Sequence, residues 1–178
     1  MPGLRLVRTV DLTAAERSEV RGLLVHAFAG DFSEHDWEHA LGGTHALLRS
    51  EGRLVGHAAL VPRRLFHLGR ALWTGYVEAL AVDPDARRRG HGTELMRALA
   101  RSMRTGGFEL GALAATDAGA ALYAPLGWLR WEGPTLVLSP EGWVRTPEDD
   151  GSVHVLPLSA GVDVREALGC DWRSGDPW

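Results

Sequence analysis

The hydrophobic positions of the sequence change their period several times along the chain. Alternating or continuous apolar runs predict strands, whereas apolar residues three or four positions apart predict helices. Thr13 with Glu16, and Ser33 with Asp36, have the spacing of capping boxes, which begin helices. Pro62 is expected to end or bend the strand before it. The predicted strands span 4–10, 45–48, 54–61, 72–82, 110–115, 131–138 and 153–158, and the predicted helices span 13–28, 33–41, 95–103 and 117–125.

The order of these elements predicts the fold class. A strand and two helices are followed by three strands, which the turns Glu51-Gly52 and Gly69-Arg70 join as an antiparallel run. A helix, a strand, a helix and two strands come next. This order is typical of a mixed α/β or α+β domain rather than a doubly wound one. The 178 residues suit one domain with a full core, so a single domain over 1–178 is predicted, with 159–178 as a C-terminal tail.

Composition and charge narrow the class of protein. Hydrophobic residues make up 45% of the chain and charged residues 24%, as in ordinary soluble proteins. A formal net charge of −4 argues against a nucleic-acid partner and is compatible with a cationic substrate. The single cysteine, Cys170, excludes an intramolecular disulfide and a cysteine-rich zinc site. With neither a signal-peptide pattern nor a long apolar run, we expect a cytoplasmic protein without a membrane partner.

The segment from Val77 to Gly92 holds the clearest candidate for ligand chemistry. An apolar strand runs into Asp83-Pro84, then into the basic loop Arg87-Arg88-Arg89-Gly90-His91-Gly92, which opens a helix. Glycines let a backbone approach a ligand closely, and a helix N-terminus offers N–H donors and positive potential. The loop is therefore a candidate pyrophosphate cradle. The alternative is a helix-opening loop with solvated arginines; the spacing fits neither a Walker nor a Rossmann loop.

The loop resembles the coenzyme A pyrophosphate loop of the GNAT acetyltransferases, whose pattern is Gln/Arg-x-x-Gly-x-Gly/Ala. The segment from Ala120 through Tyr123 to Gly127-Trp128 is similar to a second stretch of that family, in which the tyrosine lies near the thioester sulfur. The resemblance implies the GNAT acyl-CoA N-acyltransferase fold, a central mixed, mostly antiparallel sheet flanked by helices. It also implies acetyl-CoA as co-substrate and no metal. The alternative for Tyr123 is a helix residue that faces the core.

Further stretches, spread over nearly the whole chain, resemble the aminoglycoside 2'-N-acetyltransferases within that family. The resemblance implies acetylation of the 2'-amino group of these antibiotics, and with it a capacity to confer resistance. It also admits a homodimer. The stretches are Ala27-Phe28-Ala29-Gly30-Asp31-Phe32, Asp36-Trp37-Glu38-His39, Leu41-Gly42-Gly43, Gly75-Tyr76-Val77-Glu78, Arg145-Thr146-Pro147, Asp149-Asp150-Gly151 and the segment from Cys170 to Trp178.

Aminoglycosides carry several ammonium groups, so their pocket needs carboxylates that accept charge-assisted hydrogen bonds. Taken singly, each acid is better explained as a solvated surface residue or a helix cap, and Asp36 could simply cap its helix. The neighbouring Asp150 sits in the same Pro/Gly-flanked loop as Asp149, where acids are common. By resemblance, the expected substrate contacts are Asp31, Asp36, Glu78, Asp149, Asp176 and the C-terminal carboxylate of Trp178.

The expected mechanism follows from the chemistry of acetyl transfer. An alkylamine is mostly protonated near neutral pH, so a base must remove a proton before attack. Glu78 is the candidate, either as a base acting through a water or only as an anchor for the ammonium group. The resemblance assigns the oxyanion donor to the backbone N–H of Leu80 and the proton for the departing thiolate to Tyr123. The expected cofactor-binding residues are Leu80, Ala81, Val82, Arg87, Arg88, Arg89, Gly90, His91 and Gly92.

Two alternatives remain open at this point. One is a GNAT enzyme for another amine, such as a cell-wall amino sugar, a polyamine or a protein N-terminus. The other is a non-catalytic module that binds acyl-CoA or a cationic drug. Cys170 lies in the tail, away from the cofactor loop, which disfavours a covalent acetyl-cysteine route and leaves direct attack in a ternary complex. The histidines, including His57 and His67, lack metal-ligand spacing and are interpreted as structural or surface residues.

Overall fold

The computed structural model describes residues 3–178, except for the side chains of residues 117 and 118. Residues 1–2, part of the N-terminal segment inspected for a signal peptide, lie outside this range. The chain forms two compact units. One contains the described residues up to Val61 together with Val77–Ser102, and the other contains Pro62–Tyr76 together with Met103–Trp178. The long strands β3 (Arg53–His67) and β4 (Arg70–Val82) contribute to both units.

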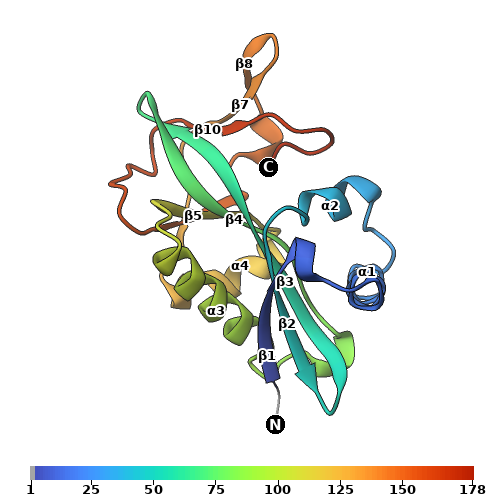
Figure 1. Ribbon diagram of the computed structural model, residues 1–178. Helices are drawn as coiled ribbons and strands as arrows, with labels where there is room; N and C mark the ends of the chain where they lie inside the picture. Colours follow the sequence, from blue (N-terminus) through green and yellow to red (C-terminus); the bar gives the residue numbers. More distant parts are fainter. Residues whose placement is uncertain (1–2) are drawn as a thin grey trace. The chain divides into compact units, whose positions relative to one another are not determined.

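The first unit is built on an antiparallel sheet in which β2 pairs with both β1 and β3 (Figure 1). The helix α1 buries Val20, Leu23 and Leu24 against core residues of these strands, including Leu47. Burial of such aliphatic side chains is the main source of stability for this packing. The other elements of the unit are β1 (Gly3–Arg8), η1 (Thr9–Asp11), α1 (Ala14–Ala27), α2 (Glu34–His39), β2 (Thr44–Ser50), η2 (Pro84–Ala86) and most of α3 (His91–Thr105).

The second unit holds the remaining strands. β5 is parallel to β4 and antiparallel to β9, while β10 lies between β3 and β7. The core of this unit gathers around the buried side chains of Tyr76, Trp131 and Trp178. Its elements are β5 (Leu110–Ala114), α4 (Asp117–Tyr123), η3 (Ala124–Leu126), β6 (Leu129–Arg130), β7 (Thr135–Ser139), β8 (Gly142–Arg145), η4 (Pro147–Asp149), β9 (Val153–Pro157) and β10 (Leu168–Asp171).

Local sequence signals agree with the structure at the helix ends. Both predicted capping boxes are confirmed: Thr13 and Glu16 cap α1, and Ser33 and Asp36 cap α2. The prediction of a mixed, mostly antiparallel sheet is also confirmed, since two of the described strand pairs, β4–β5 and β10–β7, are parallel and the others are antiparallel.

The predicted strands 54–61 and 131–138 were wrong in their extent, and the predicted tail contains a strand that was not predicted. Pro62 does not end its strand, because β3 continues to His67 and proline removes only one N–H from the ladder. The predicted strand 131–138 begins only at Thr135, since Trp131 is instead a core residue whose indole N–H donates to the carbonyl of Glu166. The tail 159–178 contains β10, which long-range pairing forms and local periodicity does not reveal.

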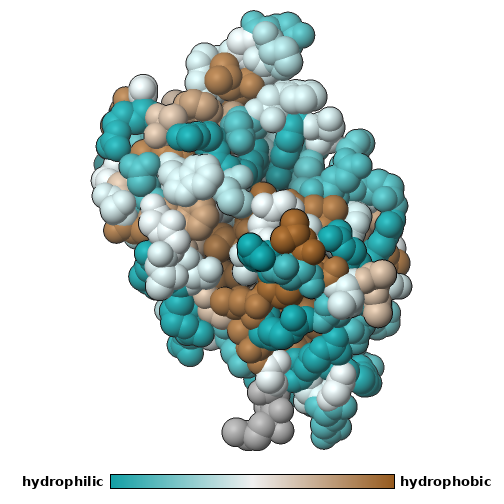
Figure 2. All heavy atoms as spheres, in the orientation of Figure 1, coloured by the Kyte–Doolittle hydropathy of each residue, from teal (hydrophilic) through white to brown (hydrophobic). Residues whose placement is uncertain are grey.

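The surface of the first unit carries some apolar area. Figure 2 shows hydrophobic atoms where β1 and β2 lie in Figure 1, and Leu6 of β1 is 43% exposed. Isolated exposed apolar residues are normal in soluble proteins and need no ligand to explain them. Among residues 3–178, no helix combines the length and the apolar character needed to cross a membrane.

Candidate functional site

The basic loop connects the end of β4 to the N-terminus of α3 in the first unit. Gly90 has a φ of +83° and Arg88 a φ of +61°, so the loop turns through left-handed backbone twice. The helix begins directly afterwards, with the N–H of Glu94 donating to the carbonyl of Gly90 at 3.0 Å. A Cβ added at Gly90 would meet no atom within 4 Å. The loop therefore presents an open, glycine-containing backbone next to the N–H donors of α3, which suits an anionic ligand.

Two of the three arginines in this loop also hold the loop itself. Arg87 donates to the carbonyls of Val82, at 3.2 Å, and of Ala27, at 2.9 Å. Arg89 donates to the carbonyl of Asp85 at 3.2 Å. The three arginine side chains are exposed. Arg87 thus ties the end of α1 to the end of β4, a structural contact that the sequence pattern did not predict.

The end of β4 places Glu78, Leu80 and Val82 in half-buried positions, whereas the side chain of Ala81 belongs to the core of the unit. Ala79, between Glu78 and Leu80, has a φ of +50°. A left-handed residue is unusual in a strand and interrupts the regular alternation of faces. The backbone is therefore distorted at the point where the expected base and the expected oxyanion donor follow one another.

Tyr123 ends α4 in the second unit and is buried. Its ring lies 6.2 Å from that of Trp128 and 5.6 Å from that of His154, measured between ring centroids. Burial raises the pKa of Tyr123 to about 12, because the phenolate would be poorly solvated. The phenol therefore keeps its proton at neutral pH, as a proton donor must.

The tail brings two acids together in the second unit. Trp178 is 4% exposed, and its indole N–H donates to Oγ1 of Thr146 at 3.0 Å. Its backbone N–H donates to the carboxylate of Asp176 at 2.9 Å. Burial, then the negative charges of Asp176 and Glu148, raise the pKa of Asp149 to about 6. A nearby negative charge disfavours the ionised form of a carboxyl group, which is why Asp176 adds to the effect of burial on Asp149.

Asp150, next to Asp149 in sequence, has a different environment. Its carboxylate accepts hydrogen bonds from Arg145 at 2.8 Å and from the backbone N–H of Thr135 at 2.9 Å. These hydrogen bonds, with Arg145 the largest contribution, lower the pKa of Asp150 well below its usual range. Asp150 therefore fixes the loop to β7, and a contact between Asp149 and a substrate stays a prediction.

The remaining expected substrate residues lie near α1 and α2 in the first unit. Asp31 is exposed in the turn between these helices, where its backbone N–H donates to the carbonyl of Phe28. The carboxylate of Asp36 accepts the backbone N–H of Ser33 at 2.7 Å and its hydroxyl at 2.8 Å. Asp36 thus caps α2, and any contact between its carboxylate and a substrate stays a prediction.

Comparisons with known proteins show the family to which the chain belongs. Residues 12–128 match the Acetyltransferase (GNAT) family. The aminoglycoside 2'-N-acetyltransferase of Mycolicibacterium fortuitum is 49% identical over 178 residues, which cover 98% of this chain and 91% of that protein. The chain belongs to the GNAT family and, within it, to the aminoglycoside 2'-N-acetyltransferases.

Solved structures of GNAT proteins have the same fold. A GCN5-related N-acetyltransferase from Kribbella flavida matches with a TM-score of 0.61 and 25% identity, covering 75% of this chain. The chain spans 34% of the length of that protein. A GNAT family N-acetyltransferase from Escherichia coli, in complex with CoA, matches with a TM-score of 0.66 and 18% identity over 95% of this chain and 89% of that one. The GNAT fold predicted from the sequence is confirmed.

GNAT proteins use acetyl-CoA, and the loop after β4 has the features that its pyrophosphate requires. Gly90 leaves the backbone open, and α3 supplies N–H donors beside it. In the described part of the chain, no group of three or more His, Cys, Asp and Glu side chains is arranged to hold a metal ion.

The first unit of this GNAT chain holds Glu78, Leu80–Val82, the loop 87–92 and the acids near α2, while the second holds Tyr123 and the cluster of Asp149, Asp176 and Trp178. Sequence reasoning missed Thr146 and Arg173. The hydroxyl oxygen of Thr146 accepts a hydrogen bond from the indole N–H of Trp178. Arg173 donates a hydrogen bond to the main-chain oxygen of Trp178 at 2.6 Å. Both lie inside stretches that carried the family resemblance, which was the available signal.

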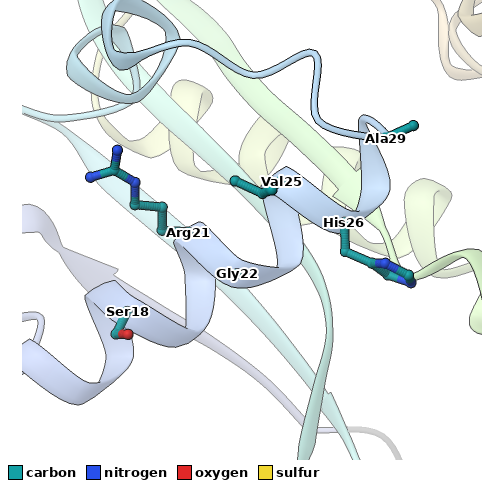
Figure 3. Close-up of a pocket in the computed structure, with 6 residues that line it drawn as sticks. All are labelled: Ser18, Arg21, Gly22, Val25, His26 and Ala29. Carbon is teal, nitrogen blue, oxygen red and sulfur yellow. The ribbon is translucent and has the colours of Figure 1, made fainter.

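A hollow of about 600 Å³ lies along α1 and holds none of the expected site residues. Figure 3 shows that its lining comes from α1 and the turn after it, with Arg21 and His26 pointing in different directions. Arg21 forms an ion pair with Glu34. This hollow is open and shallow, and we assign it no part in catalysis. Its lining residues are Ser18, Arg21, Gly22, Val25, His26 and Ala29.

Proposed function

We propose that this protein transfers the acetyl group of acetyl-CoA to the 2'-amino group of aminoglycoside antibiotics, by direct attack in a ternary complex. The observation that carries the proposal is the 49% identity, over 98% of the chain, with an aminoglycoside 2'-N-acetyltransferase. On this proposal the protein can confer aminoglycoside resistance and acts in the cytoplasm.

The paired acids of the second unit support a polycationic substrate. Burial, then the negative charge of Asp176, raise the pKa of Asp149, and a substrate ammonium group near both acids would be stabilised by two carboxylates. Asp31 and Glu78 supply further negative charge in the first unit. The main-chain oxygen of Trp178 accepts a hydrogen bond from Arg173, so a substrate amine at this oxygen would share it with that guanidinium. A peptide substrate with one amine would need fewer acids.

The residues that would hold acetyl-CoA are the loop 87–92 for the pyrophosphate, and the backbone of Leu80–Val82 for the pantetheine arm. Support comes from the left-handed φ of Gly90 and from the position of α3 directly after the loop. Backbone N–H groups at a helix N-terminus are suited to bind phosphate, and arginine adds charge. Acetyl-CoA supplies the activated acetyl thioester.

The chain's own groups would move the protons. Glu78 either accepts a proton from the substrate ammonium group through a water, or only anchors this ammonium group without moving a proton. The backbone N–H of Leu80 donates to the oxygen on which negative charge develops. The phenol of Tyr123 donates its proton to the departing sulfur. Burial raises the pKa of the Cys170 thiol to about 12, so this cysteine is not a competing nucleophile near neutral pH.

The test is a thiol-release assay with acetyl-CoA and a panel of amines. The panel contains several aminoglycosides, a polyamine, a cell-wall amino sugar and a peptide with a free N-terminus. Mass spectrometry and NMR of the product locate the acetyl group. Acetylation at the 2' nitrogen, with the aminoglycosides as the best substrates, is expected. If another amine is the preferred substrate, that amine replaces the aminoglycosides in the proposal. If the protein binds acetyl-CoA but acetylates none of the amines, it is a non-catalytic module.

A further inference from the structure

Two buried histidines form a hydrogen-bonded chain in the first unit that the proposed mechanism does not use. His45 of β2 and His57 of β3 are both fully buried. They are diagonal neighbours on paired strands, because His57 lies opposite Leu47. Nδ1 of His45 lies 2.9 Å from Nε2 of His57, and Nδ1 of His57 lies 2.9 Å from the carbonyl oxygen of Ala79. Buried polar groups are normally hydrogen-bonded, so the pairing itself is expected. The hydrogen-bonded chain, however, ends at the carbonyl of Ala79 in β4.

The direction of the hydrogen bonds in this chain follows from its ends. A carbonyl oxygen only accepts, so Nδ1 of His57 carries the proton and donates to Ala79. Burial of both rings lowers the pKa of His57 to about 3 and that of His45 to about 4, so both are neutral near pH 7. Nε2 of His57 then accepts from Nδ1 of His45.

The hydrogen bond at the other end of this hydrogen-bonded chain has the same direction. Nε2 of His45 lies 2.8 Å from the hydroxyl oxygen of Thr9. In a neutral His45 whose Nδ1 carries the proton, Nε2 has no proton and can only accept a hydrogen bond. Hence the hydroxyl is assigned as donor to His45. Each group therefore donates to the next, from the hydroxyl of Thr9 through His45 and His57 to the carbonyl of Ala79.

The residue at the end of this chain has a strained backbone. Ala79 has a φ of +50°, a conformation that costs an L-residue with a side chain free energy relative to the ordinary strand region. Such a conformation persists where surrounding contacts hold it. The hydrogen bond from His57 to the Ala79 carbonyl is a contact of this kind, and it acts on the peptide group that joins Ala79 to Leu80.

We propose that His57, oriented by His45 and Thr9, is a positioning residue that holds Ala79 in its left-handed conformation and thereby aims the backbone N–H of Leu80. This inference rests on the proposed function for the role of Leu80 in acetyl transfer. A proton relay is excluded as the purpose of the chain, because a carbonyl oxygen neither supplies nor retains a proton at neutral pH. His57 touches no reacting atom in this scheme and acts through the peptide group.

The experiment compares three replacements of His57: two imitate different ring nitrogens, and one imitates neither. His57→Asn places an amide nitrogen near the position of Nδ1 and keeps a donor toward Ala79. His57→Leu removes the donor, and His57→Gln places its amide at the position of Nε2, away from Ala79. The readouts are the backbone chemical shifts of Ala79 and Leu80 in the protein without substrates, and kcat and KM with acetyl-CoA and an aminoglycoside.

We expect His57→Leu and His57→Gln to shift the resonances of Ala79 and Leu80, and to lower kcat about 10- to 100-fold with little change in KM. His57→Asn should stay near the wild type in both readouts. Adding Ala79→Gly to His57→Leu should recover most of kcat, because glycine adopts a positive φ without a holding contact. If His57→Leu does not fold, the contrast between His57→Gln and His57→Asn decides.

His67 provides the matched control. It is also a buried histidine whose Nδ1 faces a backbone carbonyl, that of Ala167 at 3.1 Å, and no expected site residue is bonded to it. His67→Leu should leave the resonances of Leu80 and kcat unchanged. The inference is overturned if His57→Gln leaves the Ala79 and Leu80 shifts as in the wild type, or if His67→Leu lowers kcat equally. If the wild type acetylates no amine, the proposed function fails, and the chemical shifts alone decide the positioning role.

Discussion

The indole N–H of Trp178 donates to Oγ1 of Thr146 across 3.0 Å and fixes the tail beside the loop that carries Asp149. Thr146 in turn accepts the backbone N–H of Asp149 at its carbonyl. Termini are often poorly ordered unless a contact ties them down. Here the buried ring of Trp178 and this hydrogen bond do so, and a role of the tail in substrate binding stays a prediction.

Asp176→Asn should change both the titration of Asp149 and the binding of aminoglycosides. Loss of the Asp176 charge removes one cause of the raised Asp149 pKa, which should fall below about 6. Because Asp176 is exposed, the lost contact should weaken aminoglycoside binding by only about 1 kcal/mol, a five-fold increase in Kd. NMR titration and calorimetry measure both effects. In the wild type, affinity should fall as the pH drops through about 6, when Asp149 takes up a proton; an unchanged Asp149 pKa in the variant would contradict the pairing.

Trp178→Ala should destabilise the second unit as well as weaken substrate binding. Trp178 is a core residue, and truncating a buried tryptophan typically costs about 3–5 kcal/mol. Urea denaturation measures the loss. Binding of acetyl-CoA by the folded variant should be retained, because the loop 87–92 belongs to the other unit. Deletion of residues 176–178 should also lower stability and leave acetyl-CoA binding intact, with a larger loss of aminoglycoside affinity than Trp178→Ala. A truncated protein with the stability and kinetics of the wild type would show that the tail has no part in recognition.

Tyr123→Phe should lower turnover without weakening the binding of either substrate. The phenyl ring keeps its packing against Trp128 and His154, while the proton donor is lost. General acid catalysis typically contributes about 100- to 10,000-fold. Steady-state kinetics with a check that chemistry limits the rate measure the effect. Since the pKa of Tyr123 is about 12, its ionisation should leave no basic limb in the pH–rate profile below pH 9. A loss of only a few-fold would remove Tyr123 from the mechanism.

Gly90→Val should abolish measurable binding of acetyl-CoA. A residue with a Cβ pays about 1–2 kcal/mol for a φ of +83°, and a β-branched side chain would also block close approach of a pyrophosphate. Calorimetry with acetyl-CoA measures the loss. Gly69→Val is the matched control, because Gly69 has a φ of +75° in a hairpin turn outside the loop. That variant should lose similar stability and keep its affinity. Normal binding by folded Gly90→Val would disprove the loop assignment.

The buried histidine pair should make the protein acid-sensitive. The pKa values of His45 and His57 in the folded state, about 4 and about 3, lie below the ordinary value of 6.5. As the pH falls below 6.5, the unfolded chain takes up protons that the folded chain does not. The free energy of unfolding should therefore fall between pH 6.5 and 4, by up to about 1.4 kcal/mol per pH unit for each histidine. Denaturation across this range measures the slope, which should be smaller when both histidines are replaced by leucine.

Much of this protein is determined by short stretches of sequence. The helix caps at Thr13 and Ser33 were predicted correctly because a cap depends on residues three positions apart. The strand–loop–helix order around Gly90 was predicted for the same reason, since glycine, proline and helical periodicity act locally. The family followed from motifs of this kind, read together along the chain.

The tertiary structure decided what local signals leave open. Asp149 and Asp150 look alike in sequence, yet Arg145 holds Asp150, while burial and Asp176 raise the pKa of Asp149. β10 forms only because β3 and β7 offer backbone partners from distant parts of the chain. The hydrogen-bonded chain from Thr9 through His45 and His57 to Ala79 joins four residues spread over 71 positions of the sequence. Hydrogen bonds, burial and Coulomb interactions depend on distance in space, which the sequence pattern does not contain.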